Sequence, residues 1–240
     1  QAATQKCPVV WYLSGLTCSH ANVMDKGEYR RKAAELGLII VCPDTSPRGE
    51  DVANDESWQM GQGAGFYVDA TEKPWAAHFQ MYSYVTKELP ALIAENFPTD
   101  MTRQGIFGHS MGGHGALTIA LKNANTFKSC SAFAPITNPS TADWSKGALG
   151  SYLGTDEAAW ADYDAVRLIE GGARFPEVLV DQGAADNFFE GCNPHALQEA
   201  CAGTDIALTL RLQEGYDHSY FFISTFMDDH LSWHAERLTN

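Results

Sequence analysis

The chain has 240 residues, of which 45% are hydrophobic and 19% charged, and this balance is typical of one sizeable core and predicts a single domain over residues 1–240. Its 16 Lys and Arg residues against 30 Asp and Glu give a formal net charge of −14, which excludes nucleic acid and anionic membranes as expected partners. No apolar run approaches the roughly 20 residues of a membrane span.

Short apolar runs alternate with longer amphipathic segments along the chain. The predicted strands are residues 9–13, 38–41, 105–107, 131–133, 178–180 and 207–210. The predicted helices are residues 29–36, 80–94, 113–122, 194–201 and 221–238. This alternation predicts an α/β fold in which helices cover both faces of a mostly parallel sheet.

One long segment, residues 44–74, has little periodicity and contains a glycine-rich stretch at 61–65 beside Trp58. A loop of this length inside a compact domain usually serves a function. The alternative is a surface segment that packs only on itself. Elsewhere, the six cysteines show no Cys-x-x-Cys pair, and no basic-then-apolar signal pattern opens the sequence, so reduced thiols and a cytoplasmic location are expected.

A Gly-x-Ser-x-Gly motif, Gly108-His109-Ser110-Met111-Gly112, lies between a predicted strand and a predicted helix. A sharp strand-turn-helix needs residues without bulk two positions on either side of the serine, because side chains there collide across the turn. The turn strains Ser110 and directs the Met111 N–H toward a developing oxyanion. The motif therefore predicts the nucleophile elbow of an α/β-hydrolase fold, with Ser110 as nucleophile.

A serine hydroxyl needs a base, and in this fold an acid and then a histidine follow the serine in chain order. Asp186 follows the strand near residues 178–182, and His218 follows the strand near 207–212. We assign Asp186 as the acid and His218 as the base. The carboxyl ends of parallel strands meet at one edge of the sheet, where all three groups are expected to lie.

Rival assignments exist for the acid and the histidine. Asp181 lies within a strand and Asp217 adjoins the base, so both fit structural or solvated roles better. His230 and His234 have the helical i, i+4 spacing of metal ligands, but the Glu of a His-Glu-x-x-His motif and a clear third ligand are absent from the sequence around them. No metal is expected.

The second oxyanion donor should come from the loop after the strand that precedes the elbow by two strands. That loop is residues 14–18, where Gly15 allows close backbone approach and Leu16 supplies the expected N–H donor. Removing one such donor typically costs about 3 kcal/mol of activation free energy.

Several unusual strings resemble the S-formylglutathione hydrolase family, also called esterase D. They are residues 12–18, 43–49, 63–71, 107–117 and 211–220. The resemblance extends from about Val9 to the C-terminal helix and implies the same triad, Ser110, Asp186 and His218. It also implies hydrolysis of S-formylglutathione to formate and glutathione in formaldehyde detoxification, with no cofactor. A general short-chain carboxylesterase and a non-catalytic ligand-binding protein of the same fold are the alternatives.

The expected substrate pocket combines Gly15 and Cys18 with Trp58, Gly63 and Trp144. Aromatic and glycine residues of this kind are expected to close over a small acyl group such as formyl, whereas ordinary core packing is the alternative for the tryptophans. Cys18 matches a cysteine of the family, and the resemblance implies redox control through a mixed disulfide there. A buried cysteine that acts only as a small hydrophobe is the other interpretation.

The sequence departs from this family at its N-terminus, because family members begin with two further strands. We expect these strands to be missing from the sequence, which opens at Gln1 without a methionine. Their loss would leave the strand at 38–41 as an exposed apolar edge. A small-molecule thioester or ester is the expected substrate, and a homodimer is the expected assembly.

Overall fold

The computed structural model describes residues 5–239, and its six strands form one sheet in the order β2-β1-β3-β4-β5-β6. The strands are β1 (Cys7–Leu13), β2 (Ile39–Val41), β3 (Thr99–His109), β4 (Phe127–Phe133), β5 (Glu177–Gly183) and β6 (Ala207–Gln213). All five neighbouring pairs are parallel. The predicted parallel α/β architecture is therefore confirmed, and every strand except β2 is longer than its apolar run indicated.

The helices include all five that were predicted. They are α1 (His20–Lys26), α2 (Tyr29–Leu36), η1 (Trp75–Ala77), α3 (Met81–Ser83), η2 (Tyr84–Glu88), α4 (Leu89–Asn96), α5 (Met111–Lys122), α6 (Asp143–Leu153), α7 (Glu157–Ala161), α8 (Ala165–Glu170), α9 (Phe189–Cys192), α10 (Pro194–Cys201) and α11 (Tyr220–Leu238). The helix predicted over 80–94 is a run of α3, the π-helical turn η2 and α4. Helices α1 and α6 to α9 escaped prediction because they are short or weakly amphipathic.

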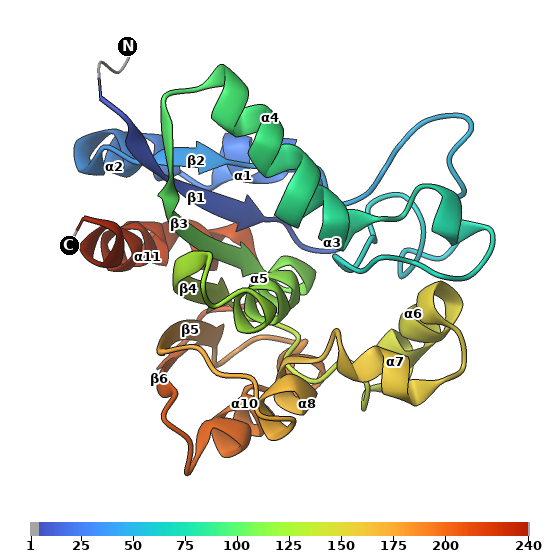
Figure 1. Ribbon diagram of the computed structural model, residues 1–240. Helices are drawn as coiled ribbons and strands as arrows, with labels where there is room; N and C mark the ends of the chain where they lie inside the picture. The colour runs from blue at the N-terminus through green and yellow to red at the C-terminus, as the bar shows by residue number, and fades with distance from the viewer. Residues whose placement is uncertain (1–4, 240) are drawn as a thin grey trace.

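Helices cover both faces of the sheet, with α1, α2 and α11 on one face and α4, α5, α8 and α10 on the other (Figure 1). Strand β1 shows why two cores form. Successive side chains of a strand point to opposite faces, so Trp11 and Leu13 enter the core with α5, while Val10 and Tyr12 enter the core with α11.

The edge of the sheet carries the short strand β2, as expected for residues 38–41. Within residues 5–239 this strand pairs only with β1, and its three side chains are partly buried. Residues 1–4 lie outside the described part of the chain. Among the described strands, β2 therefore lies at one edge of the sheet.

Beyond the carboxyl ends of the strands lie the long loop and helices α6 and α7 (Figure 1). Residues 44–74 contain turns and a single isolated bridge, between Asp69 and Gln80, but no helix or longer strand, as predicted. These segments stand on the side of the sheet where catalytic groups of α/β folds gather.

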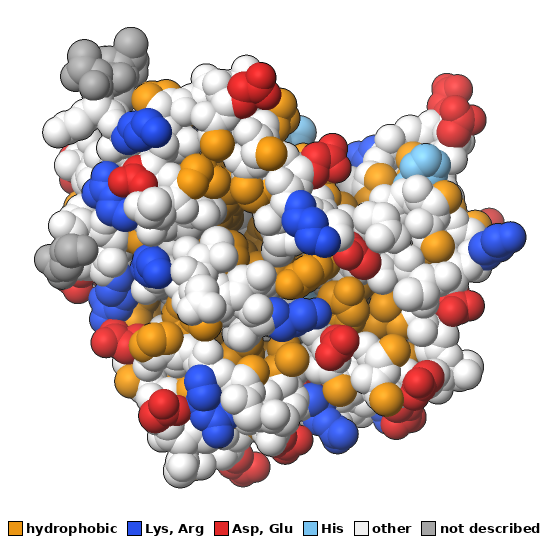
Figure 2. Space-filling model, viewed as in Figure 1, with side chains coloured by type: hydrophobic (Ala, Val, Ile, Leu, Met, Phe, Trp, Pro, Cys, Tyr) orange, Lys and Arg blue, Asp and Glu red, His pale blue; other side chains and the backbone are white. Residues whose placement is uncertain are grey.

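The surface in Figure 2 mixes charges of both signs. Lys and Arg side chains are scattered among Asp and Glu, with hydrophobic side chains gathered in the middle of this face. A polyanion needs a continuous basic surface, which this face does not offer. Among residues 5–239, no helix has both the length and the apolar character to cross a bilayer.

Candidate active site

The nucleophile elbow lies between β3 and α5, with Ser110 at its apex. Ser110 has φ 57° and ψ −117°, a conformation that L-residues adopt only under local constraint. A Cβ atom on Gly108 would come within 2.4 Å of the Gly112 oxygen, and one on Gly112 within 1.9 Å of the Leu13 oxygen. The turn closes because neither position carries a side chain.

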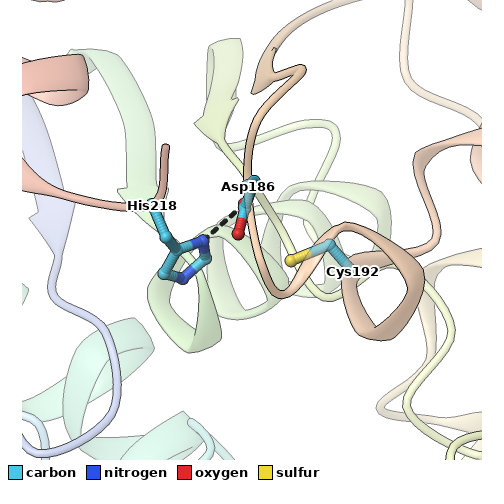
Figure 3. A group of neighbouring side chains, drawn as sticks. All are labelled: Asp186, Cys192 and His218. Carbon is cyan, nitrogen blue, oxygen red and sulfur yellow. Dashed lines mark hydrogen bonds and ion pairs between the residues drawn. The ribbon is translucent and has the colours of Figure 1, made fainter. Parts of the chain in front are cut away.

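The acid and base candidates form a direct pair at the ends of neighbouring strands. His218 Nδ1 lies 2.6 Å from Oδ2 of Asp186 (Figure 3). The same oxygen accepts a hydrogen bond from Gln182 Nε2 at 2.7 Å, and Oδ1 accepts one from the Phe188 N–H at 2.7 Å.

These contacts determine the charge of the Asp186 carboxyl. Burial alone would raise its pKa, but the hydrogen bonds from His218, the Phe188 N–H and Gln182 outweigh burial and hold the pKa below its ordinary value. An ionised Asp186 accepts a hydrogen bond from the Nδ1–H group of His218. Nε2 of the neutral ring then carries no proton and is free to accept one. This is the tautomer that a general base needs.

Ser110 and His218 line the same cavity of about 470 Å³. Within residues 5–239, no hydrogen bond joins Ser110 Oγ to the His218 ring. Contacts between nucleophile and base often tighten only once a substrate is bound. Both groups therefore border the cavity in which a bound substrate would bring them into proton-transfer contact.

The loop after β1 approaches the elbow closely. A Cβ on Gly15 would lie 3.3 Å from the Ser110 Cβ, so glycine allows the backbone to reach the nucleophile. The Thr17 N–H donates to the Gly63 oxygen, whereas the Leu16 N–H meets no acceptor in the described chain. The Met111 N–H belongs to the first turn of α5, where N–H groups lack intrahelical partners. Two backbone donors are thus available near Ser110.

Four of the five expected pocket residues line the cavity, and they are Gly15, Cys18, Trp58 and Trp144. The rings of Trp58 and Trp144 stack with centroids 6.4 Å apart, and Trp58 is 53% exposed, so it is no core residue. Gly63 does not line the cavity, so its prediction as a pocket residue is wrong. Its N–H donates to Ser46 Oγ and its oxygen accepts from the Thr17 N–H, so Gly63 supports the loop of residues 14–18 from behind.

Three residues near the base were not anticipated. The His218 ring lies between His109 and Phe188, with ring centroids 4.4 and 5.0 Å away, and Gln182 holds Asp186 from β5. Burial, and then the neighbouring His218, lower the pKa of His109 well below its ordinary value, so His109 is neutral. Their only sequence signal is adjacency to the motif or to the acid, which many residues share.

The rival acids and histidines have structural surroundings. Asp181 is buried and paired with Arg211 at 2.6 Å, and Asp217 is exposed and caps the Ser219 N–H. His230 contacts Asp181 and Ser131. His234 lies between two serine hydroxyls of β4, those of Ser129 and Ser131. The ring nitrogens of both histidines therefore pair with buried polar groups of the neighbouring strands.

Comparison with known proteins places the chain in a family. A family model described as "Putative esterase" matches residues 1–234. The S-formylglutathione hydrolase of Paracoccus denitrificans (strain Pd 1222) is 57% identical over 233 residues, which are 97% of this chain and 84% of that protein. The S-formylglutathione hydrolase of Mus musculus is 51% identical over an alignment of 243 positions that covers 99% of this chain and 86% of that protein.

A solved structure agrees with these relatives. The S-formylglutathione hydrolase from Agrobacterium tumefaciens superposes with a TM-score of 0.97 at 70% sequence identity, covering 98% of this chain and 86% of that one. Such agreement over nearly the whole chain confirms the α/β-hydrolase fold and the esterase chemistry. The chain therefore belongs to the S-formylglutathione hydrolase family, which its sequence motifs resemble.

Proposed function

We propose that this enzyme hydrolyses S-formylglutathione to formate and glutathione, with Ser110 as nucleophile, His218 as general base and Asp186 as the orienting acid. The family membership supports the substrate. The observation that carries the mechanism is the pairing of buried Asp186 with partly buried His218, which lines the same cavity as the strained Ser110.

The first half of the reaction transfers the formyl group to the enzyme. Ser110 Oγ attacks the formyl carbon while Nε2 of His218 takes the hydroxyl proton. The carbonyl oxygen becomes an oxyanion, for which the Leu16 and Met111 N–H groups are the proposed donors. The carbon–sulfur bond then breaks, and glutathione leaves as a thiolate that receives the proton from His218.

The second half releases formate. A water molecule attacks the formyl-Ser110 ester while His218 takes one of its protons. The second oxyanion collapses, the bond to Ser110 Oγ breaks, and His218 returns the proton to that oxygen. Asp186 stabilises the transient imidazolium in both halves. A thiolate leaves readily, so positioning and oxyanion binding carry most of the catalysis.

The cavity wall is proposed to select small acyl groups. Trp58 and Trp144 stack over one side of the cavity, and Trp144 Nε1 would lie 3.2 Å from a Cβ on Gly191. The two indole rings narrow the space that remains on this side of the cavity for an acyl chain. Aryl esters with long acyl chains should therefore be cleaved more slowly than the matching acetates, and equal rates would contradict the small acyl pocket.

Labelling with a fluorophosphonate separates an enzyme from a non-catalytic binder of the same fold. The wild-type protein should be labelled at Ser110, and Ser110→Ala should not be labelled. The remaining turnover of Ser110→Ala should exceed the rate of the uncatalysed reaction in water by no more than about 10³- to 10⁴-fold. A labelled Ser110→Ala variant would refute the assignment.

The alternative of a general esterase is tested by comparing kcat/KM for S-formylglutathione with kcat/KM for an aryl acetate. Equal values would contradict S-formylglutathione as the specific substrate.

Organisation and location complete the proposal. We propose that residues 1–240 form a single domain, supported by the one sheet that the described strands share. All six cysteines are free, which supports a reducing compartment such as the cytoplasm. The charge of −14 supports the absence of nucleic acid and membrane partners. A homodimer is the proposed assembly, which sedimentation velocity can test.

A further inference from the structure

Three groups of the kind that bind metal ions meet at the wall of the cavity. Cys192 Sγ, a carboxylate oxygen of Asp186 and a ring nitrogen of His218 all lie within 4.8 Å of one another. Figure 3 shows the sulfur of Cys192 directed from α9 toward the Asp186–His218 pair. Cys192 and His218 both line the cavity, so an ion from solvent can reach them.

The donor set is chemically specific. A thiolate, an imidazole and a carboxylate together match Zn²⁺, which takes three protein ligands and an open fourth position in many sites. Ligand distances of about 2.0–2.3 Å place pairs of ligand atoms about 3.5 Å apart, closer than the present upper limit. Closing the site therefore requires the Cys192 side chain, at the end of the one-turn helix α9, to move toward the Asp186–His218 pair.

We propose that Cys192, Asp186 and His218 form an inhibitory site for Zn²⁺ and for thiophilic divalent ions such as Cd²⁺. The ion is not a cofactor of the hydrolysis. Its binding follows from the three side chains alone, whereas the inhibition rests on the proposed function of His218 as the base.

Binding releases one proton and relocates another. The Cys192 thiol loses its proton to solvent, whereas the single proton of the neutral His218 ring moves from Nδ1 to Nε2, and Nδ1 then faces Asp186 across the ion instead of across a hydrogen bond. A neutral imidazole that is metallated at Nδ1 carries its remaining proton on Nε2. The nitrogen that should accept the Ser110 proton is then already protonated, so catalysis stops.

The surroundings of Cys192 show its state before metal binds. Its Sγ lies 3.3 Å from the Ala134 oxygen, to which the thiol donates. A metal ion therefore takes the place of the thiol proton at this sulfur.

Zinc titration of aryl acetate hydrolysis tests the site in the wild-type enzyme, Cys192→Ala and Cys18→Ala, each relative to its own rate without zinc. Cys18 is a matched control because its side chain lines the same cavity. Loss of the thiolate ligand should raise the half-inhibiting zinc concentration by more than about tenfold in Cys192→Ala. Cys18→Ala should match the wild type. Equal inhibition of Cys192→Ala and wild type, or relief in Cys18→Ala, would overturn the proposal.

Binding of Co²⁺ to the Ser110→Ala variant separates the metal site from the proposed function. This variant should show a thiolate-to-cobalt charge-transfer band, and the band should be absent from Ser110→Ala/Cys192→Ala. If Ser110→Ala shows no band, the metal site is refuted. This result is independent of whether fluorophosphonate labelling of the wild type confirms Ser110 as the nucleophile. If the band forms while Ser110→Ala retains wild-type turnover, the metal site stands and the proposed catalytic role of Ser110 fails.

Discussion

Contacts from individual side chains hold the proposed base, His218, in addition to its hydrogen bond with Asp186. Asp186 receives three hydrogen bonds, and the His218 ring is held between His109 and Phe188. Gln182 is the partner whose contribution can be isolated, because its Nε2 shares the Asp186 oxygen with His218 while its own Oε1 has no hydrogen-bond partner.

Gln182→Met should lower kcat by about tenfold, the value of one hydrogen bond to a charged group. Losing this donor raises the pKa of Asp186, so the carboxylate that orients His218 is neutralised at a higher pH than in the wild type. The acid limb of the pH profile of kcat/KM should therefore move to higher pH. The variant also removes the buried orphan Oε1, so its unfolding free energy should change by less than about 1 kcal/mol.

Gln213→Met provides the matched control for this substitution. Gln213 lies on the neighbouring strand β6 and its side chain bonds Asp181, outside the triad. The pH profile of Gln213→Met should stay that of the wild type. If the acid limb of Gln182→Met is unchanged, Gln182 only packs against its neighbours and does not lower the pKa of Asp186.

At the scale of elements, the junction of β1, β3 and α5 is the tightest steric point of the site. Gly112→Ala would place a methyl group 1.9 Å from the Leu13 oxygen, a contact that only backbone movement can relieve. We expect a loss of about 4 kcal/mol or more in unfolding free energy, measured by urea denaturation.

Gly147→Ala is the control for the same change at an unhindered site. Gly147 lies inside α6, and its added Cβ would meet no atom within 4 Å. Alanine should stabilise that helix by up to about 1 kcal/mol. Similar effects of both substitutions would contradict the steric account of the elbow.

Elements with strong local signals were predictable to the residue. Helix α2 ends at Leu36 and is capped by Gly37, whose φ of 67° suits glycine, and α10 begins at Pro194, which favours a first helical turn. Helices α6 to α8 were missed because they are short or weakly amphipathic, and such helices depend on tertiary packing for their stability. All strands except β2 were predicted too short, because polar residues at their ends hide the pairing.

Across the whole molecule, a buried polar network ties α11 to the sheet beneath the catalytic strands. His234 and His230 of α11 bond the hydroxyls of β4, and His230 also contacts Asp181 of β5. Arg211 of β6 pairs with Asp181 through both carboxylate oxygens. The network therefore holds together the strands that precede Asp186 and His218.

The charge on Asp181 makes stability depend on pH. Burial would raise its pKa, but bonds from His230 and Arg211 outweigh it and lower the pKa below the ordinary value. The stabilisation is thus present above the unfolded pKa of about 3.9 and is lost as pH falls through the lower folded value.

Arg211→Met leaves the buried Asp181 carboxylate without its main charged partner. Unfolding free energy measured in urea should fall by about 3 kcal/mol at neutral pH, and the difference from wild type should narrow in acid, where Asp181 becomes protonated. Arg31→Met is the control, because its ion pairs are exposed and should contribute less than about 1 kcal/mol. A difference for Arg211→Met that stays constant with pH would contradict the role of the Asp181 charge.

The parallel α/β fold, the turn at Ser110 and the candidates Asp186 and His218 could be predicted from the sequence, because periodicity, glycine sterics and strand-end order are local properties of the chain. The contacts of Gln182, His109 and Phe188 with the Asp186–His218 pair could not, nor could the place of Gly63 behind the loop of residues 14–18. The approach of Cys192 to that pair is likewise visible only in the folded chain. These contacts join side chains from separate strands, turns and helices, and their geometry depends on packing that no local pattern encodes.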